Sequence, residues 1–581
     1  MRINSIFLGE KMNINIPRKE HPKPQFERQD WLNLNGEWQF EIDNGRSGAA
    51  RGLYQTQCRL TGKILVPFCP ESKLSGIQHK DFMYGVWYKR EVEIPESKLY
   101  GRTMLHFGAV DYECTVYVNG TLAGQHKGGY VSFAFDITNY VTAGNNQITV
   151  YAVDDTRDPM IPRGKQSEEY NSHGCDYTRT TGIWQTVWLE FKPDTFVERV
   201  RYFPDSARAC LTLQAWLKGS ADLTIRAYYK GKQVGIKQLT NCAGMTTVEL
   251  PLTEKHLWEV GHGWLYQLEL EFGEDKVKSY FGLRNIRLDG MRFLINEKSV
   301  FQRLILDQGF YPDGIYTAPT DDDLKRDIEL SMAMGFNGAR PHEKIFEERY
   351  LYHCDCAGYL VWGEYPDWGL DHTRAESIYA ILPEWIEEVE RDFNHPAIIG
   401  WCPHNETWDQ NGCKQFDASI RMMYEVTKAM DSTRPCIDTS GNYHVKTDIF
   451  DLHDYHQDPK VLKEHYESLD TDGTIIDRFK ARQTYRGEPV FISEFGGIRW
   501  SDQDGWGYGD APKTGEEFLE RFKGLTAALI DNPQIFGFCY TQLTDVEQEQ
   551  NGLYTYDRKA KFAPEIIHAI VSRKSAIEES R

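Results

Sequence analysis

The second half of this sequence alternates short apolar runs with amphipathic helical stretches, and this alternation most constrains the fold. Eight apolar runs of strand length follow one another between residues 299 and 545. They are SVFQRLILDQG, FNGARP, YLVWGEYP, AIIGWCPHNE, PCIDTSGN, IFDLHDYH, PVFISEFGG and IFGFCYTQLTD. Strands that alternate with helices are typical of parallel β/α units, and eight such units in about 290 residues predict a (β/α)8 TIM barrel.

The intervening stretches carry helix signals. TDDDLKRDIELSMAMG opens with Thr320 as a cap, has an acidic first turn and closes on Gly335, as the ends of helices usually do. Further helices are expected within residues 345–358, 378–394, 416–430 and 515–533 and near the C-terminus.

Residues before 287 have a different texture. Up to residue 193, short alternating runs such as VWYKREVEI and QITVYAV recur between turns, and Asn119-Gly120 is a hairpin signal. This pattern predicts a jelly-roll β-sandwich over residues 1–193. Six or seven further strands in residues 194–286 predict a smaller, immunoglobulin-like sandwich. The barrel then takes residues 287–581.

Charge and composition exclude several classes of partner. The net charge of −20 disfavours nucleic acid and anionic membrane surfaces. No apolar stretch is long enough for a membrane span. The N-terminus has no export signal, so a cytoplasmic location and free thiols for the 12 cysteines are expected, with Met1 or Met12 as the start. Cys354 and Cys356 are interpreted as packing residues of one helix, not as a metal site.

Acidic and polar residues gather where the expected barrel strands end. In such barrels the reactive groups lie at the C-terminal ends of the strands. The fourth strand ends in His404-Asn405-Glu406 and the seventh in Ser493-Glu494-Phe495. Two carboxylates on opposite sides of a barrel mouth suit glycosidic cleavage, in which one attacks the anomeric carbon and the other exchanges a proton with the leaving group.

At this point the chain resembles glycoside hydrolase family 2, the family of β-galactosidases, β-glucuronidases and β-mannosidases. The resemblance covers nearly the whole chain and includes WLNLNGEWQFEID, GAVDYECTVYVNGTLAGQHKGGYVSFAFDIT, TRTTGIWQTVWLE and YFGLRNIRL. Its most specific matches are Asn405-Glu406 and Ser493-Glu494-Phe495-Gly496. The resemblance implies a retaining exo-β-glycosidase acting on an oligosaccharide or glycoside, with no required cofactor. A peripheral Mg, Ca or Na ion and a dimeric or tetrameric state are compatible with it.

The resemblance also implies residue roles. Glu494 is the nucleophile, Glu406 the acid/base, and Asn405 holds the sugar 2-hydroxyl. The other substrate-binding positions implied or considered are Tyr455, Asp176, Asp307, Arg340, His342, Tyr540 and Trp408. The local sequence R-P-H-E at the second strand differs from the commoner R-x-S-H. Asp307 stands where the family often has a histidine-containing loop.

Acid catalysis places a requirement on Glu406. It must hold a proton near neutral pH, and the negative charge of Glu494 is expected to raise its pKa. Tyr455 and Arg340 are expected to keep Glu494 ionised by hydrogen bond and charge.

Several alternatives remain open from the sequence. Glu364 is interpreted as a structural carboxylate of the rim. Trp362 and Trp401 are interpreted as barrel packing, whereas Trp500 and Trp506 fit either a substrate platform or core packing. A non-catalytic carbohydrate-binding protein and a metal-dependent hydrolase using His453 and His456 are the competing classes.

The residues around the eighth barrel strand bear on which sugar is bound. The region TQLTDVEQEQNGLYTYDRKAKF lacks the Asn-x-Lys pair of the β-glucuronidase branch. This absence disfavours a β-glucuronidase. A β-galactosidase-like enzyme is the first hypothesis, with β-glucosidase, arabinosidase and β-glucuronidase as alternatives.

Overall fold

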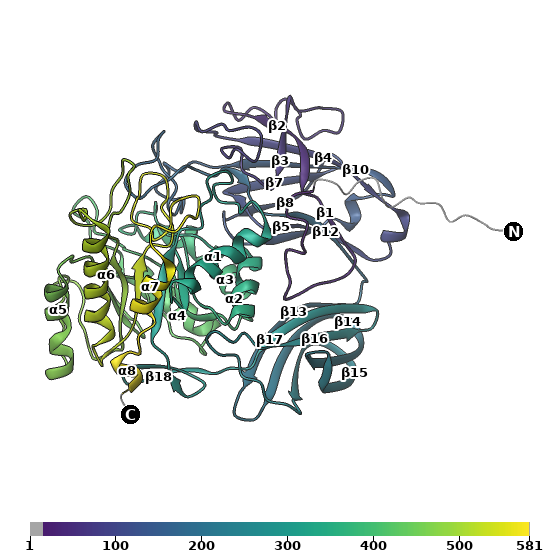
Figure 1. The fold of residues 1–581 in the computed structure, drawn as a ribbon. Helices are drawn as coiled ribbons and strands as arrows, with labels where there is room; N and C mark the ends of the chain where they lie inside the picture. Colours follow the sequence, from purple (N-terminus) through teal and green to yellow (C-terminus); the bar gives the residue numbers. More distant parts are fainter. Residues whose placement is uncertain (1–15, 580–581) are drawn as a thin grey trace.

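The computed structural model describes residues 16–579, and these form two all-β units beside one barrel. Figure 1 shows the two all-β units one above the other on one side of the molecule, with the barrel filling the other side. Among the described residues, no helix is long and apolar enough to cross a membrane, and all 12 cysteines are unpaired.

The first unit is a sandwich of two antiparallel sheets. Along a strand such as β5, buried positions alternate with partly buried ones, because successive side chains point to opposite faces of the sheet. One sheet has the order β3-β2-β4-β10-β7-β8 and the other the order β1-β12-β5-β9. The strands are β1 (Trp31–Asn33), β2 (Gly36–Ile42), β3 (Gly62–Val66), β4 (Val86–Ile94), β5 (Arg102–Phe107), β6 (Val110–Asp111), β7 (Glu113–Val118), β8 (Thr121–Lys127), β9 (Phe133–Asp136), β10 (Gly144–Val153), β11 (Gly182–Ile183) and β12 (Val187–Lys192).

The second unit has fewer and longer strands than expected. LTLQAWLKG and LTIRAYYKG, predicted as two strands, form the single strand β14 (Cys210–Tyr229), whose pairing with β15 shifts register between Leu217 and Leu223. The first half of β14 pairs with β13, and its second half pairs with β16. One long strand therefore joins β13 to β16 within a single five-stranded sheet. The remaining strands are β13 (Phe196–Asp205), β15 (Lys232–Pro251), β16 (Leu265–Phe272) and β17 (Asp275–Gly282).

The barrel is a parallel sheet with the order β24-β23-β22-β21-β27-β26-β25. Its strands are β21 (Gln302–Asp307), β22 (Gly338–Pro341), β23 (Leu360–Glu364), β24 (Ile398–Cys402), β25 (Phe450–Asp454), β26 (Val490–Gly496) and β27 (Ile535–Thr541). A small antiparallel sheet precedes them and consists of β18 (Ile286–Asp289), β19 (Arg292–Ile295) and β20 (Lys298–Ser299).

The prediction of a regular fifth strand at residues 435–442 is wrong. This segment joins β24 only by isolated parallel bridges, Trp401 to Cys436 and Asn405 to Ser440. Towards β25 it is held by side chains instead, because the Ser440 hydroxyl and the Gly441 amide both donate to Asp451 Oδ2. It therefore occupies the gap between β24 and β25 without forming a continuous ladder.

The barrel helices follow the expected order with one addition. Thr320 caps α1 in a reciprocal capping box with Asp323, which confirms the predicted start of that helix. Helix α5 was not predicted, although Asp458 caps it and Pro459 opens it. The helices are α1 (Asp321–Ala333), α2 (Glu348–Ala357), α3 (Ile378–Asp392), α4 (Asp417–Met430), α5 (Pro459–Thr471), α6 (Gly515–Ile530), α7 (Pro564–Val571) and α8 (Ala576–Glu579).

Candidate active site

Glu406 and Glu494 meet at the C-terminal mouth of the barrel. One carboxylate oxygen of each residue and a ring nitrogen of His453 all lie within 4.8 Å of one another. Glu494 lies on β26, beside His453 of β25 in the parallel register. Glu406 follows β24. The structure therefore brings together the two carboxylates that the sequence selected.

The backbone of Glu406 is held in an unusual conformation. Its φ of +53° lies in the left-handed region, which residues other than glycine seldom adopt. The segment at residues 435–441 fixes it there, since the Glu406 amide donates to the Ser440 carbonyl at 2.9 Å and the Ser440 amide donates to the His404 carbonyl at 2.8 Å. Such local strain is common at functional sites.

Arg340 anchors the Glu494 carboxylate. Its Nη1 lies 3.2 Å from Glu494 Oε1 and donates to the Ser493 carbonyl at 2.8 Å. Its Nη2 donates to Glu364 Oε2 at 2.6 Å and to Asn405 Oδ1 at 3.1 Å. Tyr455 donates its hydroxyl to Glu494 Oε2.

The surrounding charges keep Glu494 ionised. Burial alone would raise the pKa of Glu494, but the charges of His453, His342 and Arg340 outweigh it and lower that pKa. This agrees with the expectation for Arg340, and the Tyr455 hydroxyl lies within hydrogen-bonding reach as expected.

The expectation that the charge of Glu494 raises the pKa of Glu406 is wrong for the free protein. Burial would raise this pKa, but His453 Nδ1 lies 2.7 Å from Glu406 Oε1. This hydrogen bond and the His453 charge outweigh burial and lower the pKa of Glu406. The sequence could not show this, because it depends on an imidazole contributed by another strand.

Asn405 and His342 also face the carboxylates. Asn405 Nδ2 is buried and has no hydrogen-bond partner among the described residues, so an amide donor remains free for a ligand hydroxyl. His342 Nδ1 lies 2.7 Å from Glu364 Oε1, and its Nε2 lies 3.8 Å from Glu494 Oε1. Glu364 thus orients both Arg340 and His342, which fits its interpretation as a structural carboxylate.

Two predicted substrate-binding residues point away from the carboxylates. Tyr540 is fully buried and packs against Phe495 and Phe522, the latter on α6, so its ring lies on the outer surface of the barrel sheet. Asp307 is buried near Asp327 and Arg558, and it accepts a hydrogen bond from the Gly309 amide. Successive residues of a strand face opposite sides of the sheet, and Tyr540 and Asp307 both fall on the side that faces away from the carboxylates.

A loop of the first sandwich, residues 163–180, covers one side of the barrel mouth. Asp176 lies in this loop but is ion-paired with Arg163 instead of contacting the carboxylates. The Gly174 carbonyl accepts from the Trp506 and Gln548 side chains. The Tyr177 hydroxyl donates to Glu549. Asp176, named from the sequence as a substrate-binding position, therefore contacts neither carboxylate directly.

Lys165, in the same loop, was not selected from the sequence. Its side chain is buried, its Nζ lies 3.3 Å from the centroid of the Trp368 ring, and its charge acts on Glu406. Within residues 16–579, this ammonium forms no hydrogen bond or ion pair. Trp368 in turn donates Nε1 to the Asn405 carbonyl at 3.2 Å. No pattern in a single sequence marks such a residue.

The tryptophans divide as follows. Trp362 and Trp401 are buried in the barrel, as expected. Trp500 packs against Phe518 and Phe562, whereas Trp506 lies at the rim. Trp408 is 39% exposed and contacts Tyr443 and Phe479 edge-on, which leaves an aromatic face beside Glu406.

The proposed pair of metal-binding histidines does not converge. His453 faces Glu406, whereas His456 donates towards Asp454 on another side of the chain. Asp454 also accepts from His465 of α5 and from Tyr466. The imidazoles of His456 and His465 therefore belong to one hydrogen-bond network around Asp454.

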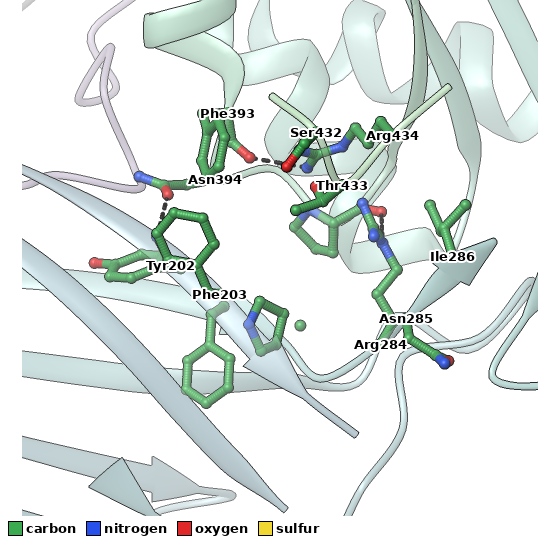
Figure 2. A pocket seen from close by; sticks show the side chains of 14 residues that line it. Tyr202, Phe203, Arg284, Asn285, Ile286, Phe393, Asn394, Ser432, Thr433 and Arg434 are labelled. Atoms are coloured by element: carbon green, nitrogen blue, oxygen red, sulfur yellow. Dashed lines mark hydrogen bonds between the residues drawn. The ribbon is translucent and has the colours of Figure 1, made fainter. Parts of the chain in front are cut away.

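A separate cavity of about 330 Å³ lies between β13, β17 and the barrel (Figure 2). It is near the N-terminal end of β24, opposite the end that leads to Glu406. Arg284 and Arg434 line it, but both guanidinium groups donate to backbone carbonyls such as that of Ile398. This cavity belongs to the junction of two domains and lies away from the paired carboxylates.

Comparison with known proteins agrees with this geometry. The family model described as "Glycosyl hydrolases family 2, sugar binding domain" matches residues 32–193, and "Glycosyl hydrolases family 2, TIM barrel domain" matches residues 287–498. The chain belongs to glycoside hydrolase family 2.

Relatives within the family carry different names. A β-galactosidase of Thermoanaerobacter pseudethanolicus is 26% identical over 65% of this chain and 52% of its own length. A β-glucuronidase of Rattus norvegicus is 25% identical over 69% of this chain and 67% of its own length. This chain thus spans about half to two thirds of these relatives.

Solved structures share the fold. A β-glucuronidase of Ruminococcus gnavus in complex with D-glucuronic acid superposes with a TM-score of 0.79 at 18% identity and covers 96% of this chain and 100% of its own. A β-glucuronidase of an uncultured Clostridium sp. superposes with a TM-score of 0.77 at 20% identity and covers 94% and 98%.

Proposed function

We propose that this protein is a retaining exo-β-glycosidase in which Glu494 attacks the anomeric carbon and Glu406 exchanges protons with the leaving group and water. The observation that carries the proposal is the separation of the two carboxylates, whose oxygens approach within 4.8 Å. Retaining glycosidases hold these groups about 5–5.5 Å apart, whereas inverting enzymes need about 6.5–9.5 Å to fit a water molecule between them. Intact carboxylates also argue against a binding protein without activity.

The reaction follows from these positions. Glu494 attacks the anomeric carbon as the bond to the leaving oxygen breaks, and the leaving oxygen takes a proton through Glu406. Water then attacks the glycosyl ester of Glu494 and gives a proton back through Glu406. Asn405 Nδ2 offers the free donor for a sugar hydroxyl. The covering loop at residues 163–180 supports exo action because it closes one side of the mouth.

The first experiment is turnover of a panel of p-nitrophenyl glycosides, with the galactoside as the leading substrate and glucoside, arabinoside and glucuronide beside it. Glu494→Gln should reduce kcat by at least about 10⁴-fold, because the reaction then lacks its nucleophile. Glu464→Gln, on the exposed face of α5, is the matched control and should retain full activity. Proton NMR of the first product should show the β-anomer. An inverted first product would overturn the retaining mechanism.

One observation favours a β-glucuronide as the second candidate substrate. The Lys165 ammonium is buried beside the site and lacks a hydrogen-bond acceptor among the described residues, and a sugar carboxylate would supply one. If the substrate is a uronide, Lys165→Met should lower kcat/KM for the glucuronide by roughly 10- to 100-fold. The variant Lys460→Met, at an exposed position of α5, is the control. Equal effects of Lys165→Met on galactoside and glucuronide would reject this role.

A further inference from the structure

His453 lies between the two carboxylates of the site. Its Nδ1 is 2.7 Å from Glu406 Oε1, and its Nε2 is 3.4 Å from Glu494 Oε1. The side chain is almost fully buried, at 1% exposure. One imidazole therefore contacts both the proposed acid/base and the proposed nucleophile.

The fold makes room for this ring. Gly441 has a φ of +84°, and a Cβ at that position would lie 2.5 Å from His453 Nδ1. Only glycine at position 441 allows the imidazole to occupy its place. His453 and Tyr455 are two residues apart, so both side chains face the barrel mouth.

The hydrogen bonds indicate where protons are. The Ser440 hydroxyl donates to Asp451 Oδ2 at 2.7 Å, which leaves it a lone pair for His453 Nε2 at 3.1 Å. Nε2 then carries a hydrogen. The 2.7 Å contact between Nδ1 and Glu406 Oε1 joins two groups that each accept when unprotonated, so it requires one further proton.

We infer that His453 holds the proton that Glu406 delivers to the leaving group, so that the free enzyme stores one proton on an imidazolium between two carboxylates. This inference rests on the proposed glycosidase function and adds a third member to its proton exchange. His453 acts through Glu406 and is therefore a positioning residue, not one that touches the substrate.

The proton balance closes over the two steps. In the first step Glu494 forms its bond to the anomeric carbon and loses its charge, the imidazolium passes its proton to Glu406, and Glu406 protonates the leaving oxygen. In the second step water attacks the glycosyl ester, and its proton returns through Glu406 to His453 as Glu494 leaves as a carboxylate. Each step begins and ends with Glu406 ionised and with the same total charge.

The charged neighbours of His453 favour this storage. Burial disfavours the imidazolium, but the charge of Glu494 and the hydrogen bond and charge of Glu406 outweigh it and raise the pKa of His453. Arg340 opposes them. Asp451 also faces the ring, although His444 shares that carboxylate. As Glu494 loses its charge during the first step, one of the two favourable charges is lost, so the imidazolium becomes the better proton donor within that step.

The test is the pH dependence of kcat/KM for a substrate with a poor leaving group, compared between the wild type and His453→Gln. In the wild type the alkaline limb reports loss of the stored proton from the imidazolium. Without His453 the proton must reside on Glu406, whose carboxyl has a lower intrinsic pKa, so the limb should move to lower pH by at least about one unit. Activity at neutral pH should fall by roughly 10²-fold and recover as the pH is lowered.

Leaving-group dependence supplies a second readout in the same variant. A 2,4-dinitrophenyl glycoside needs little protonation, so His453→Gln should cleave it at a rate close to that of the wild type. His456→Gln, at an exposed position of the same segment, is the control and should show the wild-type limb. A uniform loss at every pH, with the limb unmoved, would indicate a structural role and overturn the inference.

A measurement on the wild type avoids dependence on a folded variant. Nitrogen NMR of protein labelled at histidine distinguishes an imidazolium from a neutral ring. The His453 ring should be doubly protonated at neutral pH and become neutral after Glu494 is trapped by a 2-deoxy-2-fluoroglycoside. A ring that is neutral before trapping would overturn the inference. If the wild type cleaves no glycoside at all, the proposed function fails instead, and the two failures remain distinguishable.

Discussion

The Glu494 carboxylate is held by two side chains, Arg340 and Tyr455. Arg340 contacts Glu494, Glu364 and Asn405 at once, and Tyr455 donates to the second oxygen of Glu494. A buried carboxylate that is supplied with donors and a positive charge remains ionised and keeps its direction. Glu494, the proposed nucleophile, is thus oriented before a substrate arrives.

At the residue scale, Tyr455→Phe should lower kcat by roughly 10²-fold, because one hydroxyl that orients Glu494 is lost. KM should change less. The matched control is Tyr540→Phe, which removes a hydroxyl on the outer side of the barrel, where it accepts from the Ile498 amide. Steady-state kinetics on both variants separates the two tyrosines. A loss in Tyr540→Phe as large as in Tyr455→Phe would contradict the placement of Tyr540.

At the element scale, the loop of the first sandwich is fastened to the barrel rim. Thr178 donates its hydroxyl to Glu547 Oε1 at 2.5 Å and its amide to Glu547 Oε2 at 3.2 Å. Tyr177 adds the hydrogen bond to Glu549. The position of this loop, which carries Lys165 and forms one wall of the barrel mouth, therefore depends on contacts between two domains.

Glu547→Ala should loosen this wall without removing a core residue. We expect KM to rise by roughly 3- to 10-fold with a smaller change in kcat, since binding is weakened while the carboxylates stay in place. Glu464→Ala on α5 serves as the control because that side chain is 54% exposed. If kcat falls and KM does not change, the loop acts on the chemical step instead of on binding.

At the scale of the whole molecule, Arg28 joins the two all-β units. Its Nε and Nη2 donate to Asp275 of β17 at 2.8 and 2.9 Å, and its Nη1 donates to Glu190 of β12 at 3.0 Å. All three side chains are at most 6% exposed. Removing one charged side chain from such a buried group lowers the stability of the fold, because the remaining charges are left without compensation.

Arg28→Met should lower the free energy of unfolding by about 3–5 kcal/mol. Lys63→Met, which removes an exposed pair with Glu37, should lower it by at most about 1 kcal/mol. Thermal unfolding of both variants, read by calorimetry, checks the difference.

The effect of Arg28 should also depend on pH. Burial alone would raise the pKa of Glu190, but the charge of Arg28 and the hydrogen bond of His106 outweigh it and lower that pKa. A carboxyl with a lowered pKa in the folded state stabilises above its unfolded pKa of about 4.3, and this contribution is lost as the pH falls towards the folded value. The stability gap between wild type and Arg28→Met should therefore persist at neutral pH and narrow below about pH 4. A gap that is constant down to pH 3 would argue that lost packing, not charge, is responsible.

The sequence by itself determined the fold class and singled out the two carboxylates of the candidate site. Alternation of period two marked the sandwich strands, alternation of strands with helices marked the barrel, and Glu406 and Glu494 stood at strand ends where barrel chemistry lies. These are local patterns, set by side-chain periodicity and by chain order. Helix α5 carried the same local signals in Asp458 and Pro459.

Only the tertiary structure decided which side chains share the site. Tyr540 and Asp307 were named from strand ends, but the parity of their strands turns them outwards. Lys165 arrives from another domain, and His453 reaches Glu406 only because Gly441 leaves space for its ring. The pKa of Glu406 is lowered for the same reason, since it depends on a charge brought close in space by a neighbouring strand. Contacts between distant segments set these properties, and no local pattern in the chain encodes them.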